Sequence, residues 1–68
     1  MGMEEYHTLA VYDEEIGQWF DEFGSYLKGE VREEEAIARE HYGWTHIVTT
    51  DGTQEALVSA LRRLNDQF

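Results

Sequence analysis

The sequence predicts one small α+β domain, in which a three-stranded sheet carries two helices on one face in the order strand, strand, helix, strand, helix. Three observations favour this class: stretches of β-branched residues, stretches with apolar residues at helical spacing, and a length of only 68 residues without proline. A chain this short buries only about 60% of the surface that its unfolded form exposes, so we expect a single domain of marginal stability spanning residues 1–68.

The C-terminal third is the clearest part of the pattern. Residues 44–50, WTHIVTT, are rich in β-branched side chains and predict a strand that ends at the turn residues Asp51 and Gly52. Thr53 or Asp51 can then cap a helix. That helix is predicted by apolar residues one helical turn apart, namely Leu57, Ala60, Leu61 and Leu64. Phe68 extends the same stripe.

The N-terminal part allows two interpretations. Residues 6–12 alternate as a strand does, and residues 13–27 fit either a hairpin returning as a second strand or a helix capped by Asp13. We favour the hairpin because Gly17 and Gly24 would each cost a helix about 0.8–1 kcal/mol and because aromatic residues prefer strands. A helix capped by Ser25 is then expected to run to about Tyr42.

The long connection through this helix predicts the strand order 2-1-3, with the third strand antiparallel to the first; a parallel pairing beside the second strand is the alternative. Because both helices are expected on one face, the other sheet face would be uncovered. Its aromatic residues, such as Tyr12, Trp19 and Phe23, would favour a homodimer. The predicted core consists of Leu9, Val11, Phe20, Leu27, Val31, Ala38, Ile47, Leu57, Leu61 and Leu64.

The charge is strongly acidic and unevenly distributed. Fifteen acids against five bases give a net charge of −10, and residues 1–27 contain seven acids but no Lys or Arg. Such a field attracts basic proteins and repels nucleic acid and anionic membranes, so neither of these is an expected direct partner.

No catalytic, metal or nucleotide motif accompanies this charge. His7, His41 and His46 lack the spacing of a zinc site, and the paired acids do not match a calcium loop, so we expect no cofactor, no metal and no enzyme activity. The absence of cysteine suits a reducing compartment, and the acidic start lacks the pattern of a secretion signal, so a cytoplasmic location is expected.

The predicted function is therefore that of an acidic protein-binding module that engages a basic surface of a partner protein. Where that partner otherwise holds nucleic acid, the module would act as a DNA-mimic inhibitor. The alternative is a small structural or regulatory homodimer whose acidity serves only solubility or salt adaptation. The predicted partner-binding residues are Asp13, Glu14, Glu15, Trp19, Asp21 and Glu22.

Overall fold

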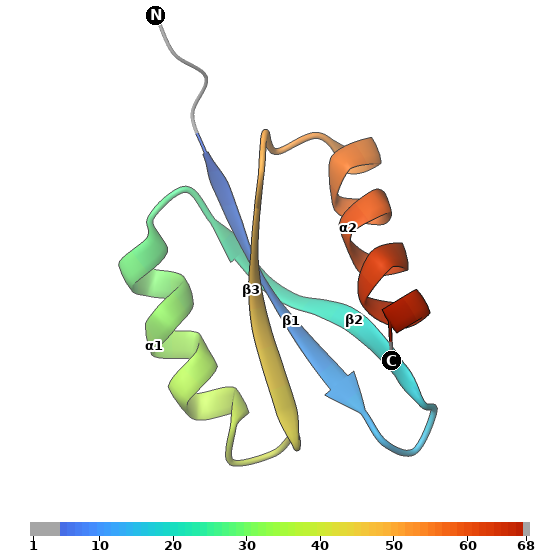
Figure 1. Cartoon of the computed structure of the whole chain (residues 1–68). Coiled ribbons are helices and arrows are strands. Elements are labelled where there is room, and N and C mark those ends of the chain that lie inside the picture. The colour runs from blue at the N-terminus through green and yellow to red at the C-terminus, as the bar shows by residue number, and fades with distance from the viewer. Residues whose placement is uncertain (1–4, 68) are drawn as a thin grey trace, which may run out of the picture.

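The computed structural model describes residues 5–67 and confirms the α+β class and the predicted order of elements (Figure 1). The elements are β1 (Tyr6–Asp13), β2 (Gln18–Ser25), α1 (Lys28–Ala38), β3 (Trp44–Thr50) and α2 (Gln54–Gln67). Residues 13–24 thus form a hairpin and not a helix. The turn closes where the Gly17 N–H donates to the Asp13 carbonyl at 2.8 Å, and Gly17 has a φ of +64°, which glycine adopts without steric cost.

The sheet has the predicted order β2-β1-β3, and β1 is antiparallel to both neighbours. The pairing of β1 with β3 is unbroken from Tyr6 opposite Thr50 to Tyr12 opposite Trp44. The pairing of β1 with β2 shifts between Leu9 and Ala10, where Glu22 is an extra residue that forms a β-bulge. The central strand is therefore β1, and the two edges of the sheet are β2 and β3.

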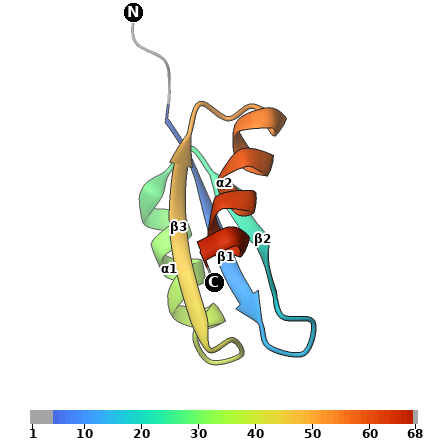
Figure 2. The same cartoon turned by 45° about the vertical axis from the view of Figure 1, so that its right-hand side comes forward.

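The two helices lie on opposite faces of the sheet, so the expectation that both cover one face is wrong (Figures 1 and 2). Leu9 and Val11 of β1 pack with Val31 and Ala38 in a core that includes α1. The alternate β1 residues face α2. The physical reason is the central strand itself, which has five consecutive buried residues, 7–11, and an apolar strand of this kind needs cover on both sides.

The helix placement explains which core predictions succeeded. Leu9, Val11, Val31 and Ala38 are buried, whereas Leu27 is 63% exposed, so its predicted burial is wrong. Leu27 is the N-cap of α1 and no side chain caps this helix, so the predicted Ser25 cap is wrong; the Ser25 hydroxyl instead accepts the Leu27 N–H at 3.0 Å. Phe68 lies outside the described residues. The other predicted core residues are half-buried: Phe20, Ile47, Leu57, Leu61 and Leu64. The core residues that the sequence analysis missed are Ala10, Trp19 and Ala60.

The predicted cap of α2 is confirmed. The Thr53 hydroxyl accepts the Ala56 N–H at 3.2 Å, and the Asp51 carboxylate accepts both the N–H and the hydroxyl of Thr53, at 3.0 and 2.8 Å. These hydrogen bonds, the backbone one first, hold the pKa of Asp51 below its ordinary value of 3.8. By contrast, α1 ends at Ala38, about four residues before the predicted end, and continues as a turn in which the Tyr42 N–H donates to the Ala38 carbonyl at 2.9 Å.

Candidate partner-binding site

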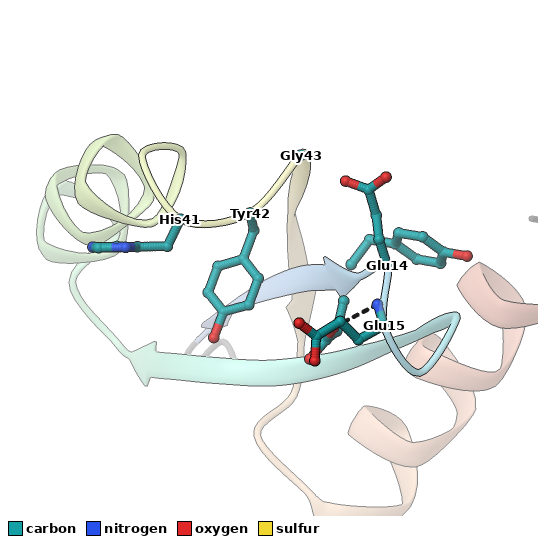
Figure 3. Close-up of a pocket in the computed structure, with 7 residues that line it drawn as sticks. Glu14, Glu15, His41, Tyr42 and Gly43 are labelled. Carbon is teal, nitrogen blue, oxygen red and sulfur yellow. Dashed lines mark hydrogen bonds between the residues drawn. The ribbon is translucent and has the colours of Figure 1, made fainter.

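An open hollow of about 350 Å³ lies between the β1–β2 turn and the loop that joins α1 to β3 (Figure 3). The antiparallel pairing of β1 with β3 brings these two segments together, because the end of β1 lies beside the start of β3. Its lining combines three acids with two aromatic residues, a histidine and a glycine: Tyr12, Asp13, Glu14, Glu15, His41, Tyr42 and Gly43.

The turn fixes the positions of the three acids. Asp13 is the last residue of β1, and its carboxylate accepts the Glu15 N–H at 2.9 Å, so this side chain is tied to the turn. Glu14 and Glu15 are exposed and lie on the turn, and the Glu14 carboxylate points toward the loop that carries Gly43 (Figure 3). A Cβ atom at Gly43 would lie 3.1 Å from a carboxylate oxygen of Glu14. The loop backbone therefore approaches the turn closely, and glycine leaves room for the Glu14 side chain.

Tyr42 supplies an aromatic wall. Its ring is half-buried and packs edge-to-face on Phe20, with ring centroids 5.7 Å apart, so the α1 side of the core holds it in place. The His41 imidazole points away from the carboxylates (Figure 3). The part of the hollow nearest the acids is thus bordered by carboxylates and a fixed tyrosine, a combination that suits a cation.

No basic side chain neutralises these acids within the described part of the chain. All five Lys and Arg residues lie in α1, directly after it, or in α2, and the hairpin has none. Among residues 5–67 there is one ion pair, in which Arg39 lies 3.6 Å from Glu35 on the flank of α1. The potential of the hollow is therefore negative and is not balanced locally.

The structure places five of the six predicted site residues in two groups and buries the sixth. Asp13, Glu14 and Glu15 meet at the hollow. Asp21 and Glu22 are exposed on β2, four and five residues beyond Gly17 at the end of the turn, or about 13–17 Å along the strand. Trp19 is only 6% exposed, and its backbone N–H donates to the Asn65 side chain at 2.7 Å, so it packs beneath α2 and does not form part of the exposed acidic surface.

Tyr42 and Gly43 were missed as members of the site. Their signal was the predicted strand order, since an antiparallel first and third strand must bring residues 13–15 beside residues 41–43. That adjacency could have been inferred before the structure was known.

The wider comparisons add no assignment. The chain matches no known family model, no curated protein and no solved structure. Within residues 5–67, no three His, Asp or Glu side chains are grouped so as to hold a metal ion. Neither α1 nor α2, as described, is long and apolar enough to cross a membrane.

Proposed function

We propose that this chain is a non-enzymatic binding module, acting in the cytoplasm, whose β1–β2 turn engages a basic surface of a partner protein. The observation that carries the proposal is the hollow in which Asp13, Glu14 and Glu15 gather without a neutralising base. An arginine or lysine of the partner enters this hollow. A guanidinium group pairs with a carboxylate through parallel hydrogen bonds and also stacks on an aromatic ring, and Tyr42 supplies that ring.

Asp21 and Glu22 extend the acidic surface along the same hairpin. Charges at this distance from the hollow steer a basic partner during its approach, which raises the association rate more than the final affinity. A protein with a basic groove for nucleic acid offers cations at comparable spacing, and the chain would then compete with DNA for that groove. With such a partner, the binding module would therefore act as a DNA-mimic inhibitor.

Binding of a basic side chain can be tested with the chain alone. We expect an arginine-rich peptide, titrated into isotopically labelled protein, to shift the backbone resonances of residues 13–15 and 41–43 more than those of α2. The affinity should fall as salt rises from about 0.1 M, where the Debye length is about 10 Å, to 1 M, where it is about 3 Å. Shifts spread evenly over the acidic residues would contradict a defined site.

A charge-matched pair of variants separates the site from general acidity. Glu14→Lys with Glu15→Lys removes the carboxylates of the hollow, and Glu33→Lys with Glu40→Lys makes the same charge change at exposed positions of α1 and the turn after it. Only the first pair should weaken peptide binding strongly, by about tenfold or more. Equal loss in both pairs would reduce the attraction to net charge.

The native partner can be sought by capture from host extract at low and high salt, with and without competing DNA. Release by salt, slower capture with Asp21→Lys and Glu22→Lys, and displacement by DNA are expected for a basic nucleic-acid-binding partner. A partner retained through salt and unaffected by charge reversal would contradict an acidic-surface mechanism, and the acidity would then serve only solubility.

A further inference from the structure

The two edges of the sheet differ sharply in how well they are protected. The β2 edge carries the bulge at Glu22 next to the charged Asp21. In addition, Asn65 of α2 accepts the Trp19 N–H at 2.7 Å and donates to the Trp19 carbonyl at 3.5 Å, so a side chain occupies the backbone polar groups of that residue. Charge, a bulge and a covering side chain are the devices by which proteins prevent an edge strand from pairing with another chain.

The β3 edge has none of these devices. Its seven residues, WTHIVTT, include no charged residue, no glycine and no proline, and its pairing with β1 is unbroken. Arg39 and Glu35 both reach the Thr45 hydroxyl and pair with each other, so their charges balance at that position. A straight, neutral edge of β-branched residues is a template for a further strand.

We propose that β3 is a dimerisation edge, at which a second copy of this chain pairs antiparallel about a two-fold axis and forms a continuous six-stranded sheet. The distribution of charge selects a second copy over a basic partner, because β3 offers no carboxylate for a basic strand to recognise. In the order 2-1-3-3-1-2, the two acidic β2 strands lie at opposite ends of the sheet, five strand spacings or about 24 Å apart. That separation exceeds the Debye length of about 8 Å at physiological salt, so their repulsion is screened.

The side chains of β3 are compatible with such self-pairing. With the axis at Ile47, Thr45 lies opposite Thr49 of the second copy and His46 lies opposite Val48. Trp44, which is 51% exposed, lies opposite Thr50. Threonine pairs and pairs of aromatic with β-branched residues are favourable across antiparallel strands. This interface is separate from the acidic hollow, and it replaces the expected dimer through an open sheet face, which α2 covers.

The test compares one substitution at two exposed histidines. His46→Lys places a charge near the centre of β3, whereas the control His41→Lys makes the same change in the loop before β3. Both reduce the net negative charge, so general repulsion between copies falls in both variants. Sedimentation equilibrium at physiological salt should show dimers for both the natural chain and the His41→Lys variant, and the loop lysine should not raise the dimer dissociation constant. His46→Lys should raise the dimer dissociation constant by about tenfold or more, because a lysine from each copy then lies at the interface between the two β3 strands.

Amide hydrogen exchange gives a second measurement that does not depend on a variant. Protection of residues 44–50 should rise with protein concentration, while protection of β2 stays constant. A natural chain that remains monomeric at millimolar concentration would overturn the proposal. Dimerisation of the His46→Lys variant with unchanged affinity would overturn it as well, and circular dichroism of each variant establishes that the monomers are folded.

Discussion

Gly24→Ala tests the packing of the hairpin most directly. A Cβ atom at position 24 would lie 2.8 Å from Cε2 and 2.9 Å from Cζ of the Tyr6 ring, which is well inside van der Waals contact. The Tyr6 ring also packs edge-to-face on Tyr26, with centroids 4.8 Å apart, so it cannot swing away without losing that contact. Overpacking of this kind costs about 1–3 kcal/mol, and the ring pair adds about 0.5–1.5 kcal/mol if it is lost.

The free energy of unfolding from urea titration, followed by tryptophan fluorescence, measures this cost. We expect a loss of about 1–3 kcal/mol, with a fall in melting temperature of about 4–8 °C for each kcal/mol. The same substitution in a Tyr6→Ala background should change stability by less than about 0.5 kcal/mol, because the clash is gone. Gly29→Ala is the control: nothing lies within 4 Å of its added Cβ, and the α1 position should gain up to about 1 kcal/mol. Equal costs of Gly24→Ala with and without the Tyr6 ring would refute the argument.

Three further substitutions probe single polar groups. Thr8 is 2% exposed and its hydroxyl has no hydrogen-bond partner among the described residues, so Thr8→Val should stabilise the fold by about 1 kcal/mol in urea titrations. Asn65→Ala should cost about 1–2 kcal/mol in the same assay and leave Trp19 more accessible to a fluorescence quencher. Asp51→Asn should remove a stabilisation that is complete above pH 4 and declines as pH falls through the lowered pKa of Asp51; an unchanged difference between the two proteins at pH 2 and pH 6 would contradict this assignment.

Local patterns predicted the elements, and the errors arose where an element meets the rest of the fold. The strand at 44–50 and the capped helix after it depend on neighbouring residues alone, and both are confirmed. The hairpin required only a comparison of glycine cost with strand preference. The face that each helix covers depends on the sheet, and the relevant signal was burial on both sides of β1, where Ala10 and Thr8 are as enclosed as Leu9 and Val11.

Trp19 shows why the acidic surface could be predicted only in part. An aromatic residue between acids is typical of an exposed binding surface, but Trp19 packs against α2, whereas Asp21, two residues further along β2 on the same sheet face, stays exposed. Its partner, Asn65, is 46 residues away in sequence and follows no motif. The exposure of the turn acids was predictable because a charged turn between two strands has to face solvent.

The tasks of the acidic residues differ, and this difference bears on function. Asp51 caps the Thr53 N–H, Asp13 accepts a turn N–H, and Glu35 pairs with Arg39, so each of these carboxylates stabilises the fold. Glu14 and Glu15 accept no hydrogen bond through their side chains among the described residues. Both line the hollow together with Asp13, so the negative charges lie close to one another. Like charges held together without a structural partner cost free energy, and a basic ligand removes that cost on binding. The fold therefore leaves these two carboxylates available for a cation.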